Sequence, residues 1–154
     1  MPLSIGSQMP SLEGCTEWIN GRIAPENPMG HPTLVYFWAV SCPICKMNMP
    51  RLQELTRLFS ECGLKLVSIH MPRGAEDQDV TQVKAVAGEI GLVGPCAIDN
   101  AHTLGDLFET GGVWPCYFLY DAEGKLRSRA SGQLGLKMAE NSLKRLLELE
   151  GVSA

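Results

Sequence analysis

The sequence lacks the excess of positive charge that is typical of a surface that binds nucleic acid. Its 154 residues include 13 Lys and Arg against 17 Asp and Glu, which gives a formal net charge of -4 at neutral pH. The basic residues are scattered along the chain and form no basic run. This balance provides no electrostatic basis for binding nucleic acid or an anionic membrane surface. We therefore expect neither as a partner.

The sequence also lacks a long hydrophobic run and an export signal. Its longest apolar stretch is far shorter than the roughly 20 residues that cross a bilayer as a helix. Residues 1–10 show no positively charged segment followed by an apolar core, which is the pattern of a signal peptide. We therefore expect a cytoplasmic protein with no membrane contact, although a secreted protein without its leader would show the same N-terminus.

Internal repeats, low-complexity segments and linker-like shifts in composition are absent as well. With 45% hydrophobic and 19% charged residues, the composition is that of an ordinary globular protein. A chain of 154 residues is long enough to build a substantial core without disulfide bonds. We predict a single domain over residues 1–154, and we expect it to be a monomer.

One pair of cysteines has the spacing of a functional motif. Cys42-Pro43-Ile44-Cys45 directly follows an apolar run over residues 33–40, which predicts a buried strand. After the motif the apolar positions change to helical spacing, so a helix should begin at Cys42. At a helix start a thiolate is stabilised by unpaired backbone N–H groups and by the helix dipole. Because the thiolate is the nucleophile in disulfide exchange, the motif indicates a redox site.

The residues around the motif are predicted to have distinct roles. Cys42 should attack a substrate disulfide, and Cys45, one turn later and more buried, should resolve the mixed disulfide. Pro43 suits the first helical position, because the N–H that it lacks would have no partner there. Trp38 is expected to be a core aromatic residue or to form a wall beside the sulfur. Pro50 lies inside the helix and should kink it.

Metal binding is an alternative function for the cysteine motif. Zinc needs four ligands, typically two cysteine pairs or one pair with spaced histidines. The remaining candidate ligands are isolated in the sequence: Cys15, Cys62, Cys96, Cys116, His31, His70 and His102. We therefore expect no metal, and we interpret the other four cysteines as reduced residues in or near the core.

Strands and helices alternate along the chain in an order typical of an α/β fold. Asn20-Gly21 is a turn signal that predicts a short N-terminal hairpin around residues 18–23. A strand at 33–40, a helix at 43–59 and a strand at 64–70 should form a right-handed parallel βαβ unit. The pattern continues with a helix from about 80 to 90, a short strand at 97–98, a brief helix near 102–108, a hairpin over 117–130 and a helix at 136–150. We predict a central mixed β-sheet with helices on both faces.

Trp114-Pro115, at the head of a predicted strand, is a second candidate feature. Its peptide bond is a candidate for the cis form, although a trans proline is also allowed at the first residue of a strand. If the segment folds beside the cysteine pair, the backbone of Trp114 can pair with an extended substrate segment. Cys116 follows directly, and if it also lies at the site, strong oxidation could trap a Cys45–Cys116 bond.

The segment from Phe37 to Lys46, with Pro50 five residues after the second cysteine, resembles the active-site region of the thioredoxin superfamily. Pro115, before a strand that ends at residues 121–124, fits the same pattern. The extended N-terminus resembles the TlpA/ResA-like branch. The resemblance is closest to the YkuV-type thiol-disulfide oxidoreductases, and its residues span nearly the whole chain: Trp18-Ile19-Asn20-Gly21, Pro32-Thr33-Leu34, Ser41-Cys42, Cys45-Lys46, His70-Met71-Pro72-Arg73 and Gly135-Leu136-Lys137-Met138.

This resemblance implies a thioredoxin-like fold, dithiol–disulfide exchange without a bound cofactor, and a cytoplasmic protein. Cys42 then corresponds to the nucleophile, Cys45 to the resolving thiol and Pro115 to the cis-proline. Three positions depart from the family pattern. Tyr36 stands where thioredoxins carry a buried acid six residues before the first cysteine, and Trp114 stands where the branch usually has Val or Thr. Cys116 stands where relatives often have Thr or Ala.

We therefore predict a thiol-disulfide oxidoreductase that reduces protein disulfides through Cys42 and Cys45 and is reduced again by an upstream thiol donor. A thiol peroxidase on a related fold is a second hypothesis. It would need a Thr-containing peroxide pocket with a later Arg, and the sequence does not show this arrangement. A non-catalytic module of the zinc-binding or chaperone type is a third hypothesis, which stoichiometric zinc in the protein would favour.

Overall fold

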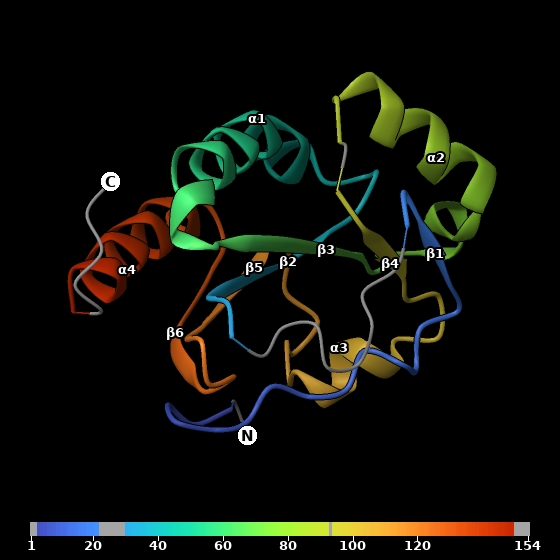
Figure 1. Ribbon diagram of the computed structural model, residues 1–154. Helices are drawn as coiled ribbons and strands as arrows, with labels where there is room; N and C mark the ends of the chain where they lie inside the picture. The colour runs from blue at the N-terminus through green and yellow to red at the C-terminus, as the bar shows by residue number, and fades with distance from the viewer. Residues whose placement is uncertain (1–2, 22–29, 93, 150–154) are drawn as a thin grey trace.

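A mixed β-sheet forms the centre of the computed structural model, which describes residues 3–21, 30–92 and 94–149 (Figure 1). The described part contains one sheet of six strands in the order β1-β4-β3-β2-β5-β6. Adjacent strands are parallel for β2–β3 and β3–β4 and antiparallel for β1–β4, β2–β5 and β5–β6. The strands are β1 (Glu17–Ile19), β2 (Thr33–Trp38), β3 (Lys65–His70), β4 (Cys96–Ile98), β5 (Cys116–Tyr120) and β6 (Leu126–Ser131).

Helices cover both faces of this sheet. Apolar side chains of α1 (Pro43–Leu58), α2 (Val80–Glu89) and α4 (Gly135–Leu149) join one core cluster. Helix α3 (Thr103–Leu107) and part of the N-terminal segment pack into a second cluster on the opposite face, as Figure 1 shows. The predicted βαβ unit is confirmed, with α1 as the connection between the parallel strands β2 and β3.

Strand β2 lies in the middle of the sheet, and all six of its residues are buried. Alternate side chains therefore enter the two clusters: Tyr36 and Trp38 face α1, whereas Val35 and Phe37 face α3. The register pairs Trp38 with His70 of β3. The ends of β2 and β3 thus meet at one edge of the sheet, directly before the cysteine motif.

The N-terminal strand pairs with β4 in antiparallel orientation, with Trp18 opposite Ala97. Asn20 and Gly21 both have positive φ, as the predicted turn requires. The second arm of the predicted hairpin, at residues 22–23, lies outside the described residues. The hairpin of β5 and β6 is confirmed. In the described part, no helix combines the length and the apolar character that crossing a membrane demands.

Candidate active site

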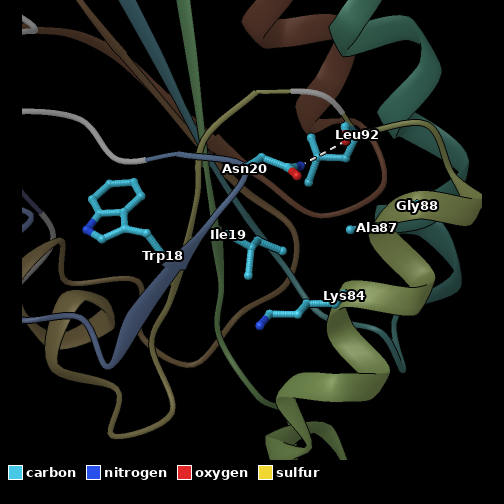
Figure 2. A pocket seen from close by; sticks show the side chains of 7 residues that line it. All are labelled: Trp18, Ile19, Asn20, Lys84, Ala87, Gly88 and Leu92. Carbon is cyan, nitrogen blue, oxygen red and sulfur yellow. Dashed lines mark hydrogen bonds between the residues drawn. The ribbon is translucent and has the colours of Figure 1, made fainter.

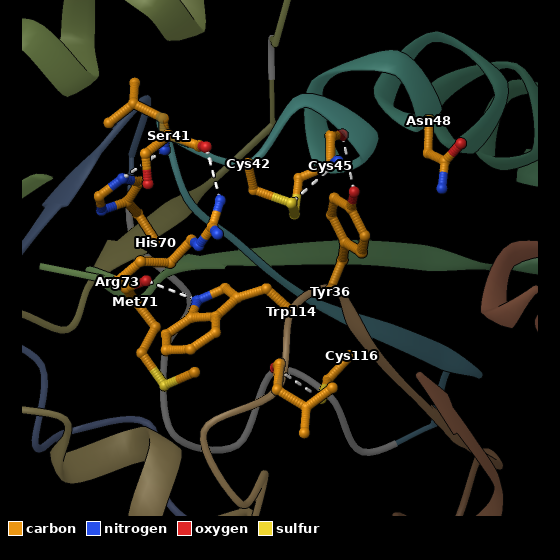
Figure 3. Close-up of a disulfide and its surroundings, with 12 residues drawn as sticks. Tyr36, Ser41, Cys42, Cys45, Asn48, His70, Met71, Arg73, Trp114 and Cys116 are labelled. Atoms are coloured by element: carbon orange, nitrogen blue, oxygen red, sulfur yellow. Dashed lines mark hydrogen bonds between the residues drawn. A yellow bond between two sulfur atoms is a disulfide. The ribbon is translucent and has the colours of Figure 1, made fainter. Parts of the chain in front are cut away.

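Cys42 and Cys45 are joined by a disulfide at the N-terminus of α1, with their Cα atoms 5.3 Å apart (Figure 3). Cys42 is the N-cap residue, and Pro43 occupies the first turn of the helix, as the sequence indicates. The backbone N–H of Cys45 donates to the Cys42 sulfur at 3.2 Å. The sulfur thus takes the place of the capping oxygen that usually accepts from the first turn. In the reduced protein the same donor would stabilise a Cys42 thiolate.

The two sulfurs differ in access. Cys42 is 4% exposed, and Cys45 is fully buried among apolar side chains under α1. A substrate therefore reaches the sulfur of Cys42 first, and Cys45 is placed to attack from behind. This order fits the roles of nucleophile and resolving thiol that the sequence predicts.

The last residue of β3 and the segment that follows it hold the two residues before Cys42. The backbone N–H of Val40 donates to Nε2 of His70 at 3.1 Å. The hydroxyl of Ser41 donates to Oδ2 of Asp77 at 2.6 Å, and Nη1 of Arg73 donates to the Ser41 carbonyl oxygen, also at 2.6 Å. Residues 40 and 41 are thus fixed by three hydrogen bonds from the end of β3 and the segment after it. Figure 3 shows the bond between Arg73 and Ser41.

His70 accepts this hydrogen bond as a neutral imidazole. Burial lowers the pKa of His70 to about 4, although the nearby charge of Asp77 acts in the opposite direction. Near neutral pH the lone pair of Nε2 is therefore available to Val40, and the ring proton lies on Nδ1. Asp77 is itself 2% exposed, and its Oδ2 also accepts the backbone N–H of Arg73 at 2.9 Å. Oδ2 of Asp77 thus accepts two hydrogen bonds.

Trp38 is a core residue whose ring contacts His70. Its ring is fully buried, lies in the same cluster as both cysteines, and meets the His70 ring edge-on with a centroid distance of 4.9 Å. Pro50 lies inside α1 with its side chain exposed, where its ring removes one helical N–H donor. A kink at Pro50 stays a prediction.

Tyr36 occupies the position of the buried acid in thioredoxins, and its chemistry is different. Its hydroxyl donates to the carbonyl oxygen of Cys45 at 2.7 Å, and its ring packs against Tyr117 with a centroid distance of 5.0 Å. Burial raises the pKa of Tyr36 well above its usual value. The phenol therefore stays neutral and anchors the backbone of Cys45, but it does not supply a base for the thiol.

Trp114 and Pro115 directly precede β5, beside the end of β2. The peptide bond between them is cis. The indole Nε1 of Trp114 donates to the Met71 carbonyl oxygen at 2.7 Å, and the Met71 N–H donates to the Trp38 carbonyl oxygen at 2.9 Å. These bonds join the segments after β2, after β3 and before β5 into one site.

Cys116 does not belong to this site. It pairs with Phe37 in the sheet register, and its side chain lies in the cluster under α3, whereas Cys45 lies under α1. Its thiol donates to the Val113 carbonyl oxygen at 3.1 Å, and burial raises its pKa to about 12. The expectation that Cys116 could form a bond with Cys45 is therefore wrong, because the sheet separates the two side chains.

A pocket of about 390 Å³ lies between β1 and α2 (Figure 2). Asn20 closes one end of it by donating to the Leu92 carbonyl oxygen at 2.9 Å, and Lys84 pairs with Glu17 nearby. Two strands, β4 and β3, lie between β1 and β2, and no cysteine lines the pocket, so it is separate from the disulfide site. Its lining residues are Trp18, Ile19, Asn20, Lys84, Ala87, Gly88 and Leu92.

The sequence interpretation missed the polar groups that support Cys42. His70, Arg73 and Asp77 are about thirty residues away in the chain, at the end of β3 or shortly after it. His70 and Arg73 belong to the His70-Met71-Pro72-Arg73 segment of the resemblance, but the sequence interpretation gave neither residue a role at the site. Within the described residues, no group of three or more His, Cys, Asp or Glu side chains is arranged to hold a metal ion.

A mixed sheet between two helical layers, with a CxxC disulfide at the start of α1, defines a thioredoxin-like protein. The family can be stated more closely. The chain belongs to the AhpC/TSA family, whose model matches residues 5–129.

Known proteins similar to this chain include two bacterial thiol-disulfide oxidoreductases. YkuV of Bacillus subtilis (strain 168) is 36% identical over 146 residues, which cover 94% of this chain and 97% of YkuV. ResA of Bacillus thuringiensis (strain Al Hakam) is 26% identical over 144 residues, which cover 94% of this chain and 79% of ResA. A thioredoxin-like protein in its oxidized form, solved in solution, has a TM-score of 0.86 and 35% identity, covering 96% of this chain and 99% of its own.

Proposed function

We propose that this protein is a thiol-disulfide oxidoreductase that reduces disulfides in protein substrates through Cys42 and Cys45. The observation that carries the proposal is the position of Cys42, whose sulfur accepts the Cys45 N–H at the start of α1. The similarity to YkuV and ResA over almost the whole chain supports the same chemistry.

The reaction proceeds in two exchanges. The Cys42 thiolate attacks one sulfur of the substrate disulfide, the substrate S–S bond breaks, and the released substrate thiolate takes up a proton. Cys45, once deprotonated, attacks the Cys42 sulfur, so that the mixed disulfide breaks and the second substrate thiol leaves. Two electrons have then passed to the substrate, and the Cys42–Cys45 disulfide remains. An upstream dithiol donor reduces this disulfide by the same exchange in reverse.

The substrate segment binds along Trp114 and Pro115 in this proposal. These residues precede β5, and the indole of Trp114 is fixed on the Met71 carbonyl oxygen. An extended substrate segment that pairs with the Trp114 backbone would place its disulfide over Cys42, as in strand addition. The proposal also includes action in the cytoplasm as a monomer without a bound cofactor. Cell fractionation and light scattering measure the location and the oligomeric state.

Two measurements test the function: the activity of a Cys42→Ser variant and the reduction potential of the Cys42–Cys45 pair. Replacing Cys42 by Ser should abolish reduction of an insulin disulfide, whereas Cys62→Ser, which changes a half-buried cysteine after α1, should retain it. Unchanged turnover in Cys42→Ser would contradict the proposal.

Equilibration with thiol buffers, followed by alkylation and mass spectrometry, gives the reduction potential of the Cys42–Cys45 pair. We expect a reduction potential of about −270 mV for a reductant, and a potential of about −120 mV would indicate an oxidant.

A further inference from the structure

The segment after β3 places an arginine at the edge of the disulfide site. The Arg73 side chain is exposed, and its Nη1 donates to the carbonyl oxygen of Ser41, the residue directly before Cys42, at 2.6 Å. Figure 3 shows the guanidinium reaching from this segment toward Ser41, on the side of the site where Cys42 lies. A fixed positive charge therefore stands where a substrate segment must approach the sulfur.

Several hydrogen bonds hold the backbone around Arg73 in place. Its own N–H donates to Asp77 Oδ2 at 2.9 Å. The preceding carbonyl, of Pro72, lies 2.7 Å from the His102 ring nitrogen, and the Met71 carbonyl accepts from the Trp114 indole at 2.7 Å. The guanidinium is thus presented by a rigid segment, so little conformational entropy is lost when it binds a ligand.

Arg73 is also not neutralised by an acidic neighbour. In the described part of the chain, no carboxylate lies within ion-pair distance of its guanidinium, whereas Arg51 pairs with Glu54 and Glu140. Asp77 bonds to the backbone N–H of Arg73 instead. A guanidinium has five N–H donors in a planar fork, and Ser41 takes one of them. The remaining donors can bind a carboxylate.

We propose that Arg73 recognises an acidic side chain next to the disulfide of the substrate protein, and thus determines which disulfides Cys42 attacks. This inference rests on the proposed function. The net charge of the molecule is -4, which repels acidic segments, and a local cation offsets this repulsion where the substrate binds. Three other charged residues are close to Cys45 or Arg73 in the sequence. Lys46 on α1 directly follows Cys45, and the exposed residues Glu76 and Asp79 follow Arg73.

A charge-dependent preference separates this role from an effect on Cys42 alone. A cation beside the sulfur lowers the pKa of the thiol, and this would change the rate with all substrates by the same factor. Recognition of a carboxylate instead changes the ratio between acidic and basic substrates. The ratio is therefore the quantity to measure.

The test uses three synthetic peptides that share one disulfide and differ only in the residue beside it, which is Glu, Gln or Lys. We expect the protein to reduce the Glu peptide about tenfold faster than the Lys peptide in kcat/KM, with the Gln peptide between them. Arg73→Gln should lower this ratio to about twofold, and Arg73→Lys should keep part of it. Lys46→Gln is the matched control and should leave the ratio unchanged, whereas 0.5 M NaCl should lower it in the unmodified protein.

Two results would overturn the inference while the proposed function stands: equal rates on all three peptides, or an Arg73→Gln variant that slows all three by one factor. Failure of the unmodified protein to reduce even the Gln peptide would instead contradict the proposed function, and the inference with it. We expect Arg73→Gln to fold, because the exchanged side chain is exposed. Circular dichroism and the Tm of the variant check this.

Discussion

Cys42 and Cys116 are almost equally buried, at 4% and 3% exposure, yet their chemical surroundings are opposite. The sulfur of Cys42 accepts a backbone N–H at the start of α1. The sulfur of Cys116 donates to a backbone carbonyl oxygen at the start of β5. A donor directed at the sulfur favours the thiolate, and an acceptor favours the thiol. The hydrogen-bond partner, and not the exposed fraction, distinguishes the two cysteines.

The difference follows from the secondary structure on which each cysteine lies. The first turn of a helix leaves N–H groups without a backbone partner, and the N-cap side chain can take one of them. In the interior of a sheet the N–H groups are used by the neighbouring strands. Cys96 in β4 likewise donates its thiol to a carbonyl oxygen, that of Ala97, at 3.7 Å, and burial raises its pKa to about 11.

The largest expected effect is a difference in alkylation rate. In the reduced protein at pH 7, iodoacetamide should modify Cys42 more than about a thousandfold faster than Cys116, because a thiol with a pKa of about 12 is almost never ionised at this pH. Peptide mapping after timed quenching measures both rates in one sample. Comparable rates, or earlier labelling of Cys116, would contradict the comparison.

The second effect is a loss of stability in acid that arises from His70, which supports the segment before Cys42 and has no counterpart near Cys116 in this comparison. The folded pKa of His70 is about 4 and its ordinary value is 6.5, so between these values the unfolded chain binds a proton that the folded protein does not. The free energy of unfolding should therefore fall as the pH drops from 6.5 to 4, by up to about 3 kcal/mol, and this contribution is fully present above pH 6.5.

Urea unfolding at a series of pH values measures this slope. His70→Gln, whose amide oxygen accepts a hydrogen bond at any pH, should be less dependent on pH within the same window. His31 lies two residues before the start of β2, at the end of the strand away from the disulfide. The control variant His31→Gln should therefore keep the slope of the unmodified protein. An unchanged slope in His70→Gln would show that the acid sensitivity arises elsewhere.

The smallest effect concerns Tyr36, behind the resolving cysteine. Tyr36→Phe removes the hydrogen bond to the Cys45 carbonyl oxygen and should reduce the free energy of unfolding by about 1 kcal/mol. The alkylation rate of Cys42 should change by less than about twofold, because the N–H that supports its sulfur is retained. A large loss of Cys42 reactivity would mean that Tyr36 contributes to the chemistry.

The sequence was sufficient to predict the order of elements, because the apolar periodicity changes from strand to helix at the cysteine motif and again at later boundaries. It was also sufficient to place Cys42 at the start of α1. It could not place Cys116, because a shift of one residue in a strand moves a side chain to the other face of the sheet. His70, Arg73 and Asp77 were missed for another reason, since the register between β2 and β3 brings them to Cys42.

The complete burial of Cys45 has a kinetic consequence under the proposed function. A substrate can form its covalent bond with a single sulfur, so each protein molecule carries one substrate at a time. Release then depends on a sulfur of the same chain, and its rate is independent of the concentration of free thiols. The lifetime of the covalent complex is thus an intrinsic property of the protein.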